Sequence, residues 1–266
     1  MSDSEPMDVK AQTDVAETRR RYLDLIERVL RNEVHGEPRI EAWLKAAALR
    51  LRHPRQTRNW KEFWPVKAHT MLSPERLSNL RQLTEATLRD GVPGDYIETG
   101  VWRGGACILM RAVLAAYGVT DRRVFVADSF EGLPRPDAKR YPADSADRLF
   151  SFTELSVSEA QVRRNFEAYG LLDAQVVFLK GFFKDTLPTL TDERFALIRL
   201  DGDMYESTRD ALTNLYDRLS PGGYVVIDDY GILAGCRQAV HDFLKERGCA
   251  PTITDIDGKG VWWRKD

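Results

Sequence analysis

The chain has 266 residues, 43% of them hydrophobic, which is enough for one sizeable α/β core and an appended segment. Its formal net charge of −2 gives no electrostatic support for nucleic-acid or anionic-membrane partners. We expect a cytoplasmic protein, because the three scattered cysteines form no disulfide framework, no apolar run approaches the roughly 20 residues of a membrane span, and residues 1–16 lack a secretory apolar core.

The first third of the chain predicts helices and shows no chemistry of its own. Residues 1–18 carry few large apolar groups, so we expect them to be disordered. Apolar residues then recur at helical spacing from Tyr22 and again over 40–51. A third helix starts at Ser73, a capping residue that is followed by a proline and an acid. We therefore expect residues 19–92 to form a helical extension.

From Asp95 onward, short β-rich runs alternate with helices, which is the pattern of a parallel sheet covered on both faces. The expected strands are 96–98, 124–127, 176–179, 196–200 and 224–227. The expected helices are about 104–117, 157–169, 205–219 and 236–247. Residues 252–254 and 261–263, on either side of a turn, indicate a terminal hairpin. This layout resembles the seven-stranded Rossmann-like sheet of class I S-adenosylmethionine-dependent methyltransferases, and we assign the catalytic domain to 93–266.

The turn after the first strand predicts a ligand that the backbone approaches closely. The strand ends at Glu98-Thr99-Gly100, and further glycines follow at 104 and 105. The spacing is not G-x-G-x-x-G, so the pyrophosphate fingerprint of NAD enzymes is absent. A wider turn suits a ligand without a diphosphate, such as S-adenosylmethionine, although glycines after a strand are also ordinary turn residues.

Two later strand ends suit the same ligand. The second strand ends at Asp128-Ser129, where a carboxylate can accept hydrogen bonds from both hydroxyls of a ribose. The third is followed by Gly181-Phe182, where an adenine could lie against an aromatic ring. An acid at a strand end can equally be a helix cap. Between these positions, the long stretch 130–156 has no predicted element and is typical of a lid or binding loop.

Three carboxylates at the ends of the fourth and fifth strands predict a metal site. Asp201 follows one strand, Asp228 and Asp229 follow the next, and a single helix connects the two strands. Such a crossover normally places parallel strands side by side, so the acids should meet at one edge of the sheet. Crowded carboxylates repel unless a cation compensates them, and an oxygen-only set suits Mg²⁺. The alternative is a group of solvated loop acids or caps.

Asp203, two residues beyond Asp201, is the candidate general base. An alcohol hydroxyl is hardly ionised at neutral pH, and a bound cation lowers the pKa of a coordinated oxygen. A nearby carboxylate could then take the proton as the methyl group is transferred. The competing interpretation of Asp203 is an N-cap for the helix that follows.

Three segments together resemble the macrocin and mycinamicin O-methyltransferases, which methylate deoxysugar hydroxyls on antibiotics. They are 128–134 (DSFEGLP), 200–208 (LDGDMYEST) and 221–230 (PGGYVVIDDY). The noviose O-methyltransferase of aminocoumarin pathways is similar too, and the resemblance extends from about Tyr22 to the C-terminus.

The resemblance implies a role for each of these residues and a glycosylated natural-product substrate. Asp201, Asp228 and Asp229 would be magnesium ligands and Asp203 the base. Residues 98–100, 128 and 129 would bind S-adenosylmethionine, and the helices of 19–92 would cover the substrate pocket and contribute to a homodimer.

Three other functions remain open at this point. A catechol-type or phenol methyltransferase shares the metal chemistry. A nucleotide-sugar oxidoreductase is disfavoured by the missing phosphate fingerprint, and a non-catalytic nucleotide-binding module would leave the acidic cluster unexplained.

Overall fold

Seven strands form one sheet in the order β3-β2-β1-β4-β5-β7-β6. The computed structural model describes residues 5–58 and 64–266, apart from the side chains of 5–12. The strands are β1 (Asp95–Thr99), β2 (Val124–Asp128), β3 (Val176–Lys180), β4 (Phe195–Leu200), β5 (Leu219–Ile227), β6 (Thr254–Asp255) and β7 (Val261–Arg264). Strands β1 to β5 are parallel, and β7 runs antiparallel to both β5 and β6. The predicted parallel sheet with a terminal hairpin is confirmed.

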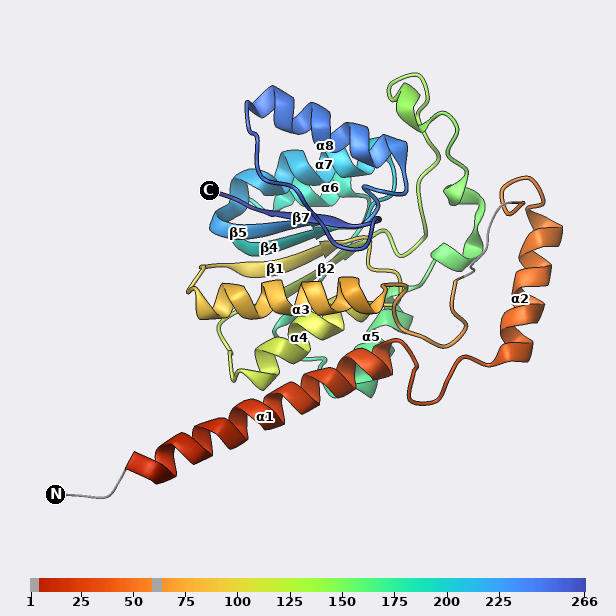
Figure 1. The fold of residues 1–266 in the computed structure, drawn as a ribbon. Coiled ribbons are helices and arrows are strands. Elements are labelled where there is room, and N and C mark those ends of the chain that lie inside the picture. The colour runs from red at the N-terminus through yellow and green to blue at the C-terminus, as the bar shows by residue number, and fades with distance from the viewer. Residues whose placement is uncertain (1–4, 59–63) are drawn as a thin grey trace.

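Helices cover both faces of this sheet (Figure 1). One face carries α3 (Pro74–Arg89), α4 (Gly105–Ala116) and α5 (Glu159–Ala168), and the other carries α6 (Phe183–Thr186), α7 (Tyr205–Leu215) and α8 (Ala234–Arg247). Helix α1 (Glu5–Leu30) contacts α3 and α4 from outside. Helix α2 (Arg39–Arg52) stands away from the sheet, beyond the carboxyl ends of the parallel strands. These helices form the expected N-terminal extension.

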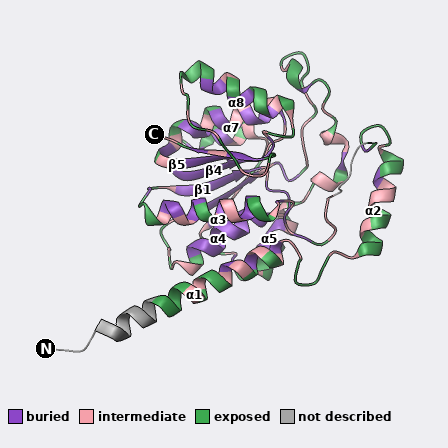
Figure 2. Ribbon diagram, viewed as in Figure 1, coloured by how far each residue is buried: buried purple, intermediate pink, exposed green. Residues whose placement is uncertain are grey.

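The central strands are largely apolar because both of their faces are buried (Figure 2). Alternate residues enter two separate cores: Tyr96 faces the α1–α3–α4 side, whereas its neighbour Ile97 faces the α7–α8 side. Both residues are completely buried. The layered packing fixes the register of the strands, since a shift by one residue would exchange the two cores.

Three element boundaries differ markedly from the sequence prediction. Helix α7 ends at Leu215, and β5 begins at Leu219 rather than at Tyr224. The three residues 221–223 are accommodated as an irregularity, because Phe195 pairs with Leu219 and Leu197 with Tyr224. Helix α1 begins at Glu5, inside the segment 1–18 that the sequence predicts to be disordered. Ion pairs of Glu17 with arginines three and four residues later support this helix from its surface.

The stretch 130–156 is a long loop, as expected, and contains only three single turns: Pro142–Asp144, Leu149–Ser151 and Thr153–Leu155. It lies beyond the carboxyl ends of the strands, on the same side as α2 (Figure 1). Across the described ranges, none of the helices combines the length and apolar character that crossing a membrane requires.

Candidate active site

The acidic residues at the ends of β4 and β5 lie together. Leu200 pairs with Ile227 in the parallel ladder, so Asp201 and the pair Asp228-Asp229 leave the sheet side by side. One carboxylate oxygen from each of the three aspartates lies within 4.8 Å of the others. Asp228 and Asp229 are buried, and Asp201 is half-buried. The geometry expected from adjacent strand ends is therefore present.

Two buried arginines, which the sequence analysis did not identify, hold this cluster. Arg199 of β4 donates to Glu98, to Asp228 and, at 2.8 Å, to Asp201. Arg76 of α3 donates to the second oxygen of Asp228 and also to Asp257 in the β6–β7 turn. The one available sequence signal was a charged residue inside the otherwise apolar strand 195–200. The arginines compensate part of the negative charge and fix both oxygens of Asp228.

Four acids of the site, Glu98, Asp201, Asp203 and Asp229, have raised pKa values. Burial raises the pKa of Asp201, Asp203 and Asp229, and the neighbouring aspartates raise it further. Burial also raises the pKa of Glu98 to about 7. Among the described residues, none is hydrogen-bonded to the buried Oδ2 of Asp229. An oxygen-only donor set with one buried oxygen left without a partner fits a hard divalent cation such as Mg²⁺.

Asp203 does not cap the following helix, so that interpretation is wrong. Its backbone adopts φ +62°, and Met204 occupies the cap position of α7. The cap comes instead from Asp144 in the long loop, whose carboxylate accepts the backbone N–H groups of Tyr205 at 2.7 Å and Glu206 at 3.0 Å. The side chain of Asp203 is therefore available to the cavities beside it.

Two cavities meet at the acidic cluster. The first, of about 250 Å³, is lined by Gly100, Asp128, Ser129 and Phe182 among others. The second, of about 640 Å³, is lined by Glu98 and all three aspartates of the cluster. Both cavities are lined by Met71, Trp102, Leu155, Asp201 and Asp203. A ligand in the first cavity can thus meet a ligand in the second beside Asp203.

The predicted cofactor residues fall into two groups. The cavities are lined by Glu98, Gly100, Asp128, Ser129 and Phe182. The carboxylate of Asp128 also accepts hydrogen bonds from the N–H groups of Val101 and Phe130. Thr99 and Gly181 line neither cavity. Thr99 is buried and accepts the N–H of Asp201 with its carbonyl oxygen, and Gly181, at φ +143°, makes the turn that precedes Phe182. These two residues shape the site through their backbone.

Four features together define a class I S-adenosylmethionine-dependent O-methyltransferase. They are the strand order with its terminal hairpin, the glycine turn after β1, the carboxylate after β2 and the acidic cluster. The Macrocin-O-methyltransferase (TylF) family matches residues 19–265, and the chain belongs to this family. Membership rules against the oxidoreductase and the non-catalytic module considered above.

Relatives of known activity resemble nearly the whole chain. A tetracenomycin 4'-O-methyltransferase of Streptomyces olivaceus, which acts on a dimethoxy-rhamnosyl group, is 52% identical over 91% of this chain and 92% of its own. The mycinamicin III 3''-O-methyltransferase of Micromonospora griseorubida is 49% identical over 92% of this chain and 96% of its own. The solved structure of the O-methyltransferase NovP has a TM-score of 0.82 at 46% identity and covers 93% of this chain and 99% of its own.

Proposed function

We propose that this enzyme transfers the methyl group of S-adenosylmethionine to a sugar hydroxyl of a glycosylated antibiotic or related natural product, and that it requires Mg²⁺. The observation that carries the proposal is the oxygen-only acidic cluster at the point where the two cavities meet. Relatives that are about half identical over nine-tenths of the chain act on sugars of such compounds.

Asp201, Asp228 and Asp229 would hold the Mg²⁺ ion, which lowers the pKa of a hydroxyl that binds to it. Arg199 and Arg76 orient Asp228 for this task, since each guanidinium fixes one of its oxygens. Asp203 faces both cavities and is the base that takes the proton of the acceptor hydroxyl. Burial and the neighbouring aspartates raise the pKa of Asp203, and a cation bound beside it would favour the ionised form that a base requires.

The first cavity suits the nucleoside part of S-adenosylmethionine. Asp128 and Ser129 stand at the end of β2, where a ribose would hydrogen-bond, and Phe182 offers a ring to the adenine. The sulfonium methyl group would then lie near Asp201 and Asp203, directed toward the larger cavity. Correct positioning of donor and acceptor for an in-line displacement would supply part of the rate enhancement, and the two adjoining cavities support such positioning.

The experiment removes one ligand of the proposed ion. Asp201→Ala should abolish methyl transfer, and the affinity for S-adenosylhomocysteine, measured by calorimetry, should stay within about twofold of wild type because the nucleoside cavity is retained. Asp192→Ala, an exposed acid elsewhere, is the control and should keep full activity. A wild-type enzyme that turns over at full rate in EDTA would refute the metal requirement. Parallel assays with glycosylated and catechol acceptors test the acceptor class.

The helical extension 19–92 would act both as a lid and as a dimerisation element. Its residues 64, 65 and 69–72 line the larger cavity, which supports the first role. Helix α2 exposes Ile40, Trp43 and Leu51 by 68–83%, which supports a homodimer that covers them. Light scattering should detect a dimer that Trp43→Glu weakens; a wild-type monomer would refute this.

Three free cysteines suit action in the reducing cytoplasm, which fractionation of the producing cells would test.

A further inference from the structure

Residues 65–72, here called the strap, are the part of the helical extension that precedes α3 and lies at the active site. The strap lines the larger cavity through Pro65, His69, Thr70, Met71 and Leu72, and Met71 lines the smaller cavity as well. It has no regular secondary structure that would fix its shape. Hydrogen bonds from other parts of the chain, together with the burial of Ala68 and Leu72, set its position.

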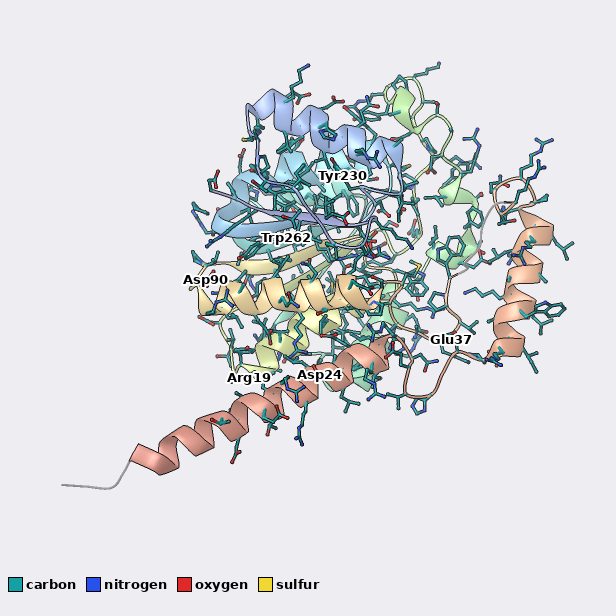
Figure 3. All side chains as sticks on the ribbon, viewed as in Figure 1. Arg19, Asp24, Glu37, Asp90, Tyr230 and Trp262 are labelled. Carbon is teal, nitrogen blue, oxygen red and sulfur yellow. The ribbon has the colours of Figure 1, made fainter. Side chains whose placement is uncertain are left out.

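A single carboxylate holds the first half of the strap. Glu37, in the connection between α1 and α2 (Figure 3), accepts the backbone N–H groups of three consecutive residues. The distances are 2.7 Å from Val66, 3.1 Å from Lys67 and 2.7 Å from Ala68. Although partial burial raises the pKa of Glu37, these N–H groups lower it more strongly, so the net shift is downward. Three hydrogen bonds to one ionised group form a strong local attachment.

A guanidinium holds two of the same three residues through their carbonyl oxygens. Arg103 belongs to the glycine turn after β1, and its Nη1 donates to the carbonyl oxygens of Val66 at 3.0 Å and Ala68 at 2.6 Å. The backbone of Arg103 is itself fixed, because Asn165 of α5 donates to its carbonyl oxygen at 2.8 Å. The strap is thus held between an acid of the extension and a base of the cofactor turn.

This attachment presses the second half of the strap against the start of α4. A Cβ atom added at Gly105 would lie 2.5 Å from the carbonyl oxygen of His69 and 2.7 Å from Cβ of Thr70, so only glycine allows the approach. Gly105 and Glu98 line the larger cavity beside the acidic cluster. If the adenine and ribose occupy the smaller cavity, the methionyl end of the cofactor extends toward this wall.

We infer that Glu37 and Arg103 are positioning residues of the methyl-transfer reaction: they hold the strap so that residues 69–71 cover the methionyl end of S-adenosylmethionine. The inference rests on the proposed use of this cofactor and its placement in the smaller cavity, but on neither the sugar nor the metal. The side chains of Glu37 and Arg103 line neither of the two cavities described above, so both residues act through the strap.

The test uses Glu37→Ala and the isosteric Glu37→Gln in the full-length protein. Both variants should raise the Kd for S-adenosylhomocysteine, measured by calorimetry in EDTA, by roughly tenfold, the scale of one hydrogen bond to a charged group. The KM for S-adenosylmethionine should rise similarly, and kcat should stay within about twofold. Hydrogen exchange of the 66–68 amides should accelerate. Glu41→Ala is the matched control, because Glu41 contacts the strap only through an exposed pair with the Lys67 side chain at 3.7 Å.

Two results would overturn the inference. Accelerated exchange with an unchanged Kd would show that the strap does not cover the cofactor, and unchanged exchange would show that Glu37 does not hold the strap. Thermal unfolding of Glu37→Gln verifies that the variant is folded, and a general loss of fold in both variants would count against a positioning role. A wild-type protein that fails to bind S-adenosylhomocysteine would instead refute the proposed function itself.

Discussion

Gly100→Ala directly tests the juxtaposition of the β1 and β4 ends on which the active site depends. Gly100 follows β1 with φ +84°, and a Cβ atom at this position would lie 1.8 Å from the carbonyl oxygen of Asp201. The N–H group of Asp201 is bonded to Thr99 at 2.9 Å, so the two strand ends are already in direct contact. The substitution therefore separates a proposed metal ligand from the cofactor turn.

The magnitude follows from two independent costs. An alanine in the left-handed region costs about 1–2 kcal/mol of the free energy of unfolding. Restoring a separation of 3.0 Å requires the strand ends to move apart by at least about 1.2 Å, and overpacking of this kind costs about 1–3 kcal/mol more. A displacement of about 1 Å at reacting groups can reduce the rate by about 100-fold.

Gly118→Ala is the matched control. Gly118 has φ +66°, and no described atom lies within 4 Å of its hypothetical Cβ, so this variant has the conformational cost without the clash. Urea unfolding should show Gly100→Ala to be less stable than Gly118→Ala by about 1–3 kcal/mol. Turnover should fall about 100-fold in Gly100→Ala alone. Equal stability and equal turnover in the two variants would refute the contact between the strand ends.

Three further changes test other parts of the site. Asp144→Ala should lower the free energy of unfolding, measured in urea, by about 1–2 kcal/mol, the cost of a lost helix cap. It should also reduce kcat, because the start of α7 adjoins Asp203, and an unchanged kcat would contradict this expectation. Protons compete with Mg²⁺ at carboxyls of raised pKa. The affinity of the protein for Mg²⁺, measured by calorimetry, should therefore increase with pH as Asp201 and Asp229 deprotonate. An affinity that does not change with pH would contradict this. Phe182→Ala should weaken S-adenosylhomocysteine binding about three- to tenfold, and unchanged binding would exclude stacking.

Much of the fold was predictable because its signals are local. Each central strand is a short apolar run followed by a turn, and the alternation of such runs with helices admits few topologies. The position of Asp201 beside Asp228 follows from the same rule, since one helical crossover joins their strands. The start of β5 was not predictable, because residues 221–223 look like a turn. They lie inside the strand as an irregularity, since Leu219 before them and Tyr224 after them both pair with β4.

The supporting residues escaped prediction because their partners are far away in the sequence. Glu37 binds residues 29 to 31 positions later, and Asp144 caps a helix 61 positions later. In sequence, the first is one acid in a short connection between two predicted helices, and the second is one acid in a polar loop. Only the tertiary arrangement distinguishes them from the solvated acids that most such residues are.

The arginines also change the reasoning that leads to a metal ion. From the sequence, three adjacent carboxylates seem to need a cation because they repel one another. In the structure, Arg199 and Arg76 supply two positive charges to the cluster, so repulsion alone no longer requires an added ion. The case for a cation now depends on Asp229. No N–H or O–H group of the described residues donates to its buried Oδ2, and Asp229 lies beside the other two candidate ligands. Because an unpaired buried carboxylate oxygen is costly, this atom is the strongest structural reason to expect a cation here.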